Sequence, residues 1–161
     1  MLIFSNKLLA VEFRDDILQT FYSFRQDTHE KYEAGGILMG KRLLNGNIII
    51  TDVTSPQIGD IRQRTFFKKK AKIHQSISDT LWKKSSGKTI YLGEWHTHPE
   101  NNPVPSTVDL RGWKLSVSKQ PNDKIYIFII LGIKELSVWS YSKIDGLIKM
   151  KQRTRENVFN E

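Results

Sequence analysis

The sequence predicts a mixed α/β domain. Short segments rich in β-branched and aromatic residues alternate along the chain with segments whose apolar residues recur at helical spacing. Asn45-Gly46, which separates two apolar segments, is typical of a β-hairpin turn. No low-complexity linker or internal repeat interrupts the 161 residues, and this length suits one hydrophobic core. We therefore expect residues 1–161 to form a single domain.

A strand over 8–13 and a helix over about 15–28 are the first predicted elements. The helix is indicated by Ile17, Phe21 and Phe24, which lie on one helical face, and by an aspartate at its N-cap. This strand-helix order is the first part of the α/β pattern.

Two strands are predicted next, at 33–40 and 47–53, and the Asn-Gly turn joins them. A polar loop then leads to a helix over 69–84, in which apolar residues recur every four positions from Ile73. These elements continue the alternation of strands and helices along the chain.

The second half carries a predicted strand at 89–97, a proline-rich rigid loop at 99–105 and a helix at 106–118. Two further strands, 124–133 and 136–141, are expected to form a hairpin at the edge of the sheet. The last dozen residues are polar, and we expect them to extend as a helix or to fray.

Composition excludes several kinds of protein. The chain has no cysteine, which rules out disulfides, cysteine zinc fingers and thiol nucleophiles, so any metal must take histidine and carboxylate ligands. The first residues do not resemble a leader and the longest apolar run, 125–133, is far shorter than the roughly 20 residues that span a bilayer, so a cytoplasmic location is expected. The formal charge of +8 is interpreted as a solvated basic surface, because no nucleic-acid-binding module is recognisable.

The segment 93–109 contains a candidate metal site. Side chains alternate along a strand, so His96 and His98 project to one face with Cα atoms about 6.5 Å apart. A helix that begins at Ser106 can present Asp109 as a third ligand. Two imidazoles and one carboxylate leave a fourth position open, as in catalytic zinc sites. Glu94 is in phase with both histidines and is the rival third ligand.

Each of these residues also has a structural interpretation. Ser106 and Asp109 match the Ser-x-x-acid pattern of a helix N-cap, although the preceding His-x-His favours metal ligation. We interpret His29 as a loop residue and His74 as the packed edge of a helix, both unrelated to the metal. Trp95 should face away from the ligands.

Glu33 is the candidate general base, because amide hydrolysis needs a carboxylate that takes a proton and passes it to the leaving amine. Gly35 and Gly36 beside it could let a substrate backbone approach closely, and strand 34–40 is expected to pair with an extended substrate tail. Spacing alone does not place Glu33 beside His96.

A family resemblance makes that link. Glu33, then His-x-His, seven residues and Ser-x-x-Asp resembles the JAMM signature of the JAB/MPN metalloproteases over residues 33–109. The resemblance implies a three-layer α/β/α fold with a mixed central sheet, related to cytidine deaminases, and one zinc ion per chain. The roles it implies are zinc ligation by His96, His98 and Asp109, general base and then acid catalysis by Glu33, and hydrogen bonding to the oxyanion by Ser106.

Within the family, residues 93–99, the proline-rich loop and Trp113 are similar to the small bacterial JAB peptidases of CBASS antiphage operons. The similarity implies an isopeptidase that releases a cGAS-like nucleotidyltransferase from the protein to which a ubiquitin-activating and conjugating type enzyme has joined it. The alternatives are a non-catalytic MPN-like scaffold, a basic nucleic-acid-binding domain, and a JAMM protease that processes sulfur-carrier or ubiquitin-like proteins.

Overall fold

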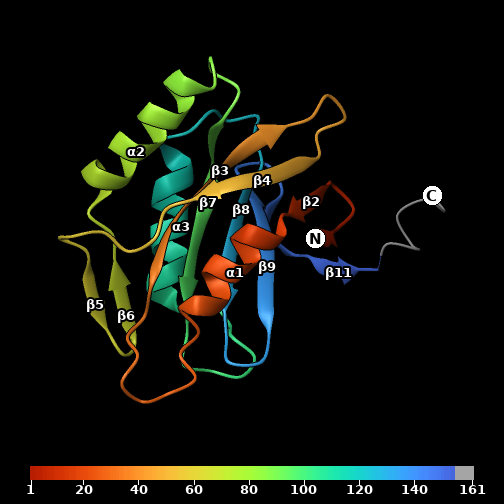
Figure 1. The fold of residues 1–161 in the computed structure, drawn as a ribbon. Helices are drawn as coiled ribbons and strands as arrows, with labels where there is room; N and C mark the ends of the chain where they lie inside the picture. Colours follow the sequence, from red (N-terminus) through yellow and green to blue (C-terminus); the bar gives the residue numbers. More distant parts are fainter. Residues whose placement is uncertain (155–161) are drawn as a thin grey trace.

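The computed structural model describes residues 1–154, which form a nine-stranded mixed sheet in the order β10-β9-β8-β7-β3-β4-β2-β1-β11 (Figure 1). A separate two-stranded sheet contains β5 and β6. The bounds are β1 Leu2–Ser5, β2 Ala10–Phe13, α1 Asp15–Ser23, β3 Gly35–Arg42, β4 Ile48–Val53, β5 Ile61–Gln63, β6 Phe66–Lys68, α2 Ala71–Lys84, β7 Ile90–Thr97, α3 Thr107–Ser118, β8 Tyr126–Leu131, β9 Leu136–Ser142, β10 Gly146–Lys149 and β11 Lys151–Arg153. The mixed sheet with its helices confirms the predicted fold class.

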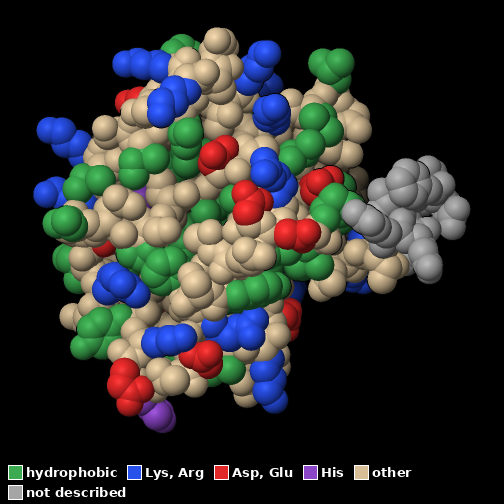
Figure 2. Space-filling model, in the orientation of Figure 1, with side chains coloured by type: hydrophobic (Ala, Val, Ile, Leu, Met, Phe, Trp, Pro, Cys, Tyr) green, Lys and Arg blue, Asp and Glu red, His purple; other side chains and the backbone are tan. Residues whose placement is uncertain are grey.

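Helices cover both faces of the main sheet. Phe21 of α1 belongs to the larger core cluster, in which it contacts Trp95 of β7. Trp113 of α3 belongs to a second cluster, in which it stacks on Phe128 of β8 with ring centroids 4.8 Å apart. Two apolar clusters therefore enclose the sheet, and β7 contacts both: Trp95 belongs to the first and Tyr91 packs against the second. Within residues 1–154, no helix is long and apolar enough to cross a membrane. Figure 2 shows lysine and arginine side chains spread over one face of the molecule, with aspartate and glutamate side chains among them.

The main sheet is strongly curved. Only Met150 separates β10 from β11, yet these strands pair with β9 and β1, which lie toward opposite ends of the strand order. Met150 is buried and its N–H donates to the Val138 carbonyl. Two expectations are corrected: residues 151–153 form a strand, and the predicted β8–β9 hairpin is confirmed but is not at the edge, because β10 pairs outside it. Residues 155–161 of the predicted C-terminal helix lie outside the described residues.

Helix α1 ends at Ser23, well before the expected end near Thr28. The cause is tertiary packing. Phe24 leaves the helix to pack against Trp95, with ring centroids 5.8 Å apart, and the buried Gln26 amide bonds to backbone and side-chain groups of neighbouring segments. These contacts outweigh the helical periodicity of the sequence.

The polar loop expected after β4 contains the short hairpin β5–β6, which the sequence analysis missed, as it missed β1. Each strand of the hairpin has three residues, too few to show the alternation by which strands are recognised. The hairpin matters because it borders the candidate site described below.

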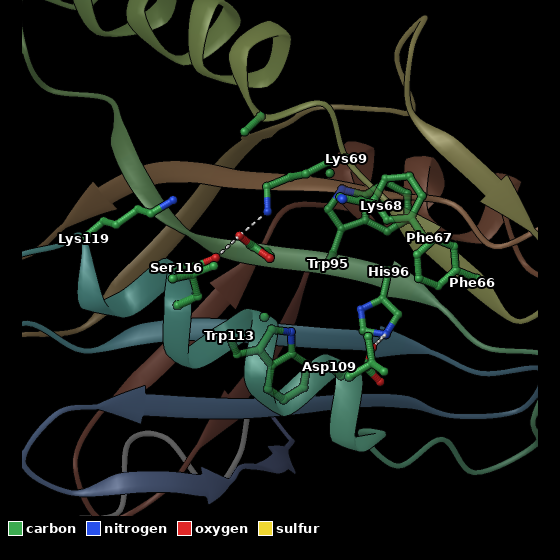
Figure 3. Close-up of a pocket in the computed structure, with 16 residues that line it drawn as sticks. Phe66, Phe67, Lys68, Lys69, Trp95, His96, Asp109, Trp113, Ser116 and Lys119 are labelled. Atoms are coloured by element: carbon green, nitrogen blue, oxygen red, sulfur yellow. Dashed lines mark hydrogen bonds and ion pairs between the residues drawn. The ribbon is translucent and has the colours of Figure 1, made fainter.

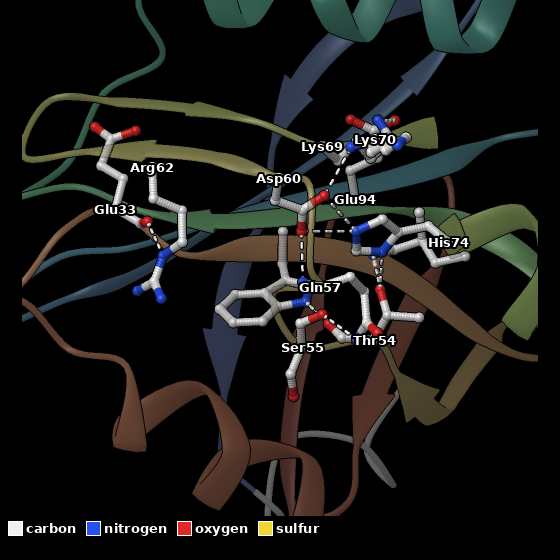
Figure 4. A network of polar contacts seen from close by, with 12 residues as sticks. Glu33, Thr54, Ser55, Gln57, Asp60, Arg62, Lys69, Lys70, His74 and Glu94 are labelled. Atoms are coloured by element: carbon white, nitrogen blue, oxygen red, sulfur yellow. Dashed lines mark hydrogen bonds and ion pairs between the residues drawn. The ribbon is translucent and has the colours of Figure 1, made fainter. Parts of the chain in front are cut away.

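A buried polar network holds the hairpin in place (Figure 4). The Thr54 hydroxyl lies 2.6 Å from His74 Nδ1, and His74 Nε2 lies 3.0 Å from the Asp60 carboxylate. That carboxylate also accepts the N–H groups of Gln57 and Lys70, each at 2.7 Å. His74 is 1% exposed, so its interpretation as a packed helix residue is confirmed. The network ties α2 to both ends of the hairpin segment.

Asp60→Ala is therefore expected to destabilise the fold. The substitution leaves the buried His74 ring and the Lys70 N–H without their acceptor, which costs about 1–3 kcal/mol. Urea unfolding at neutral pH measures the change, and Asp79→Ala, which removes an exposed carboxylate from α2, is the control. Equal unfolding midpoints for the two variants would contradict this role of Asp60.

Candidate metal centre and active site

Strand pairing brings Glu33 to the histidines. Glu33 immediately precedes β3, which pairs antiparallel with β7 so that Gly35 lies opposite His96. The backbone of Glu33 is held by the β5 strand: its N–H donates to the Gln63 carbonyl at 2.8 Å, and its carbonyl accepts from Arg62 Nε at 2.8 Å. The carboxylate is thereby fixed at the end of β7, where the histidines lie.

A bulge in β7 sets the faces of the following residues. Gly93 has a φ of 145°, and a Cβ there would lie 1.7 Å from the Ile127 carbonyl oxygen, so only glycine fits. The register with β3 shifts between Leu38 and Met39, opposite this position. Beyond the bulge, Trp95 packs into the core beneath α1, whereas His96 lies toward Trp113 of α3. The predicted opposite orientation of Trp95 is confirmed.

His96, His98 and Asp109 converge on one point. Nε2 of His96 lies 3.2 Å from Asp109 Oδ1, Nε2 of His98 lies 3.2 Å from Oδ2, and the two nitrogens are 2.9 Å apart. Zinc bonds of about 2.0–2.1 Å imply tetrahedral edges of about 3.3 Å. The chemistry and the spacing of these donors therefore fit a zinc ion, and Figure 3 shows His96 directed at Asp109. Among residues 1–154 this is the one such group of donors.

Ser106 and Asp109 form a capping box at the start of α3. The Ser106 hydroxyl accepts the Asp109 N–H at 3.1 Å, and the Ser106 N–H donates to Asp109 Oδ2 at 2.7 Å. The capping interpretation is confirmed, and it is compatible with the ligand interpretation, because the capped carboxylate is directed toward the histidines. The bond to Ser106 uses an oxygen lone pair, so the hydroxyl hydrogen remains able to donate.

The pKa values of Glu33 and Asp109 are shifted in opposite directions. Burial raises the pKa of Glu33 to about 7, an effect that His98 opposes and Asp109 reinforces. Burial would also raise the pKa of Asp109, but hydrogen bonds from His96 and His98 outweigh it and hold that pKa well below its usual range. Asp109 is therefore ionised, as a metal ligand must be, whereas Glu33 can gain and lose a proton near neutral pH.

Glu33 lies close to the candidate metal ligands, with Oε1 4.0 Å from His98 Nε2. A hollow of about 330 Å³ is lined by Glu33, Ser106 and Glu100, among other residues. Glu33, Ser106 and His98, which come from separate segments of the chain, therefore line one hollow together. This arrangement can position a water molecule, a carbonyl group and a proton acceptor together.

The rival ligand Glu94 has other partners. Its carboxylate forms an ion pair with Lys69 and accepts the Ser116 hydroxyl at 2.6 Å. His29 lies in an exposed turn, where its carbonyl accepts from Arg64. The structure therefore favours Asp109 as the third donor.

The expected substrate pairing along residues 34–40 is wrong, because β4 and β7 occupy both edges of β3. The adjacent glycines serve internal packing instead: a Cβ at Gly35 would lie 2.7 Å from the Phe67 ring, and one at Gly36 would lie 2.1 Å from the Thr54 carbonyl oxygen. Phe66 and Phe67 of β6, which were not predicted as site residues, line the hollow that contains Glu33. Adjacent aromatic residues within a polar segment were the available signal.

The fold and the site define a JAB-type domain. Residues 15–142 match the sequence model of the family Prok-JAB, which comprises prokaryotic homologs of the JAB domain. The chain belongs to this family. The resemblance inferred from the motif is thereby confirmed.

Individual relatives are similar in sequence to this protein over most of its length. A CD-NTase/cGAS isopeptidase from Escherichia coli (strain TW11681) is 36% identical over 135 residues, 83% of this chain and 82% of that protein. A protein of the same name from Vibrio cholerae serotype O1 is 34% identical over 119 residues, 74% of each chain. The solution structure of protein DSY2949 from Desulfitobacterium hafniense has a TM-score of 0.62 at 18% identity, over 86% of this chain and 88% of that one, and shows the same fold.

Proposed function

We propose that this chain is a zinc-dependent JAMM isopeptidase, with residues 1–161 acting as one domain, that hydrolyses the amide between a protein C-terminus and a lysine or fused chain. The supporting observation is the spacing of the donors of His96, His98 and Asp109, which suits one tetrahedral ion, beside the buried carboxylate of Glu33. The isopeptidase class is supported by the names of relatives that match most of this chain.

The proposed substrate is a conjugate of a cGAS-like nucleotidyltransferase, in bacterial CBASS antiphage defence. The relatives named CD-NTase/cGAS isopeptidase support this choice. A ubiquitin-activating and conjugating type enzyme would form the bond that this chain cuts. The proposed functional partner is therefore an enzyme of opposite activity.

The residues divide the reaction between them. When bound by His96, His98 and Asp109, zinc supplies Lewis acidity, which makes water a better nucleophile at neutral pH. Glu33 takes a proton from the attacking water as the new C–O bond forms, and then gives a proton to the nitrogen as the C–N bond breaks. Ser106 donates a hydrogen bond to the oxyanion between these steps. The products are a carboxylate and a free amine.

The direct test uses the nucleotidyltransferase joined through its C-terminal carboxylate to a lysine Nε of a target protein. We expect zinc-loaded protein to release both partners, with masses that match hydrolysis of one amide. A linear fusion of a sulfur-carrier protein is the comparison substrate. Absence of cleavage of the isopeptide conjugate by zinc-loaded protein would contradict the proposal, and preference for the linear fusion would assign a different substrate.

Ser106→Ala should slow turnover by about 10²- to 10³-fold, the effect of removing one oxyanion donor. Because Ser106 also caps α3, the alanine variant should lose about 0.5–2 kcal/mol of stability as well. Ser106→Gly separates these effects, since glycine caps nearly as well as serine but has no hydroxyl. Equal turnover of the glycine variant and the unaltered protein would exclude the oxyanion role.

Zinc affinity should fall as the pH is lowered. In His98, burial would lower the pKa, but the hydrogen bond to Asp109 outweighs burial and raises it above the usual value. A protonated imidazole cannot bind a metal, so the ion must displace a proton once the pH falls below this raised pKa. Competition with a chelator from about pH 8 to about pH 5.5 measures the change. A constant affinity over that range would contradict ligation by His98.

A further inference from the structure

A groove of about 460 Å³ leads away from the candidate metal ligands along α3 (Figure 3). One wall is β6 and the residue that follows it, the other wall is α3, and β7 forms the floor. Figure 3 shows Lys119 at the end of the groove opposite His96 and Asp109. One end of the groove therefore lies at the candidate metal ligands, and the other end carries a basic side chain.

Gly112 keeps the middle of the groove open. It lies inside α3, where glycine is a poor helix former, and a Cβ added there would meet no heavy atom within 4 Å. The neighbouring turns of the helix carry Val108 and Leu115, which also line the groove and are 59% and 60% exposed. An open channel with exposed apolar side chains is suited to bind part of another molecule.

The opposite wall favours an extended polypeptide. Residues 66–69 line the groove consecutively. Successive side chains of a strand point to opposite faces, so the edge of β6, rather than one face, borders the groove. Because β6 pairs with β5 alone among residues 1–154, its other edge offers backbone donors and acceptors to an added strand.

The charge of the groove is positive at its far end. Lys69 is neutralised by Glu94 in the floor, whereas Lys119 at the far end forms no ion pair within residues 1–154. Lys68 lies beside Phe67, at the end of the groove near His96 (Figure 3). Lys119 follows Asp109 by ten residues, which corresponds to about 15 Å along a helix. An extended chain covers that distance in about four or five residues.

The hollow on the other side of the candidate metal ligands indicates the direction in which the substrate chain runs through the site. It contains Glu33 and Glu100. Glu33 must reach the leaving nitrogen to protonate it, so the amine side of the substrate belongs in that acidic hollow. The acyl side, which ends as a carboxylate, then extends into the groove along α3.

We propose that the groove binds the acyl-side segment of the substrate in extended form and selects an acidic side chain about four or five residues before the cleaved bond. Lys119 recognises the acidic side chain, and Gly112 is the specificity-determining residue that provides room for the backbone. The direction of the chain rests on the proposed isopeptidase function, whereas the occupancy of the groove rests on its shape and charge.

The test measures binding to zinc-loaded Glu33→Gln protein, so that no cleavage occurs. The probes are fluorescein-labelled octapeptide mixtures with a free C-terminal carboxylate, in which one position at a time is fixed as glutamate or glutamine. We expect glutamate at about the fourth or fifth position from the C-terminus to tighten binding about two- to fivefold at low salt. Lys119→Glu should remove this preference, whereas Lys114→Glu, which changes the charge of α3 outside the groove, should retain it.

Gly112→Leu should weaken binding of every mixture by about tenfold or more, because the side chain fills the channel. Its melting temperature should equal or exceed that of the unaltered protein, since Gly112 lies in open space in a helix. Arg111→Leu, on α3 outside the groove, is the matched control and should bind normally. Normal binding by Gly112→Leu, or equal effects of Lys119→Glu and Lys114→Glu, would overturn the inference.

Cleavage by the unaltered protein separates this inference from the proposed function. Hydrolysis of the isopeptide conjugate, with no preference for glutamate at any peptide position, would refute the groove inference and leave the isopeptidase function in place. Selective peptide binding without hydrolysis of any conjugate would support the groove as a binding site and refute the isopeptidase function.

Discussion

Glu33→Gln is expected to slow hydrolysis by about 10²- to 10⁴-fold, the usual contribution of a general acid-base group. The amide of glutamine has nearly the same shape as the carboxylate but cannot take a proton from water or give one to the leaving amine. Because Glu33 is not among the three closely grouped donors, the variant should still bind one zinc ion per chain. Single-turnover cleavage rates and metal content measured on the same sample test both statements.

A matched control distinguishes this effect from a loss of one negative charge. Glu30→Gln removes an exposed carboxylate from the loop that precedes Glu33, and it should cleave at the normal rate. A Glu33→Gln protein that cleaves as fast as Glu30→Gln would exclude Glu33 from the reaction.

His96→Ala and His98→Ala are expected to abolish both zinc binding and hydrolysis. Each substitution removes one of three protein ligands, so the loss of affinity should exceed the roughly 10- to 100-fold cost of changing a residue that merely orients a ligand. Elemental analysis of the purified variants, together with the cleavage assay, measures the result. His29→Ala is the control, because His29 lies in an exposed turn away from the site. A full equivalent of zinc in His96→Ala would contradict the proposed coordination.

The helices and the longer strands could be predicted from sequence because each has enough residues to show its periodicity. The eight-residue strands β3 and β7 and the fourteen-residue helix α2 are examples. Three-residue strands such as β5 and β11 could not be predicted, because they depend on partners elsewhere in the chain. The pairing of β11 with β1, at the opposite end of the sequence, has no local signal.

The grouping of the three candidate metal ligands could also be predicted from local sequence. His96, His98 and Asp109 lie on one strand, one rigid loop and the first turn of one helix, so their spacing carries most of the geometry. Glu33 needed a family resemblance, because only the long-range pairing of β3 with β7 brings it to the histidines. The substrate pairing expected along β3 was wrong because a strand sequence does not tell whether the strand lies at an edge or in the interior of a sheet.

X-ray absorption spectroscopy of the zinc-loaded protein tests the proposed centre most directly. We predict two imidazole nitrogens and at least one carboxylate oxygen at about 2.0–2.2 Å from zinc, with an exchangeable position left to solvent. Asp109→Ala should change this shell, whereas Glu33→Gln should leave its protein ligands unchanged. A shell that survives Asp109→Ala intact, or one that includes the Glu33 carboxylate, would contradict the division of roles between these two side chains.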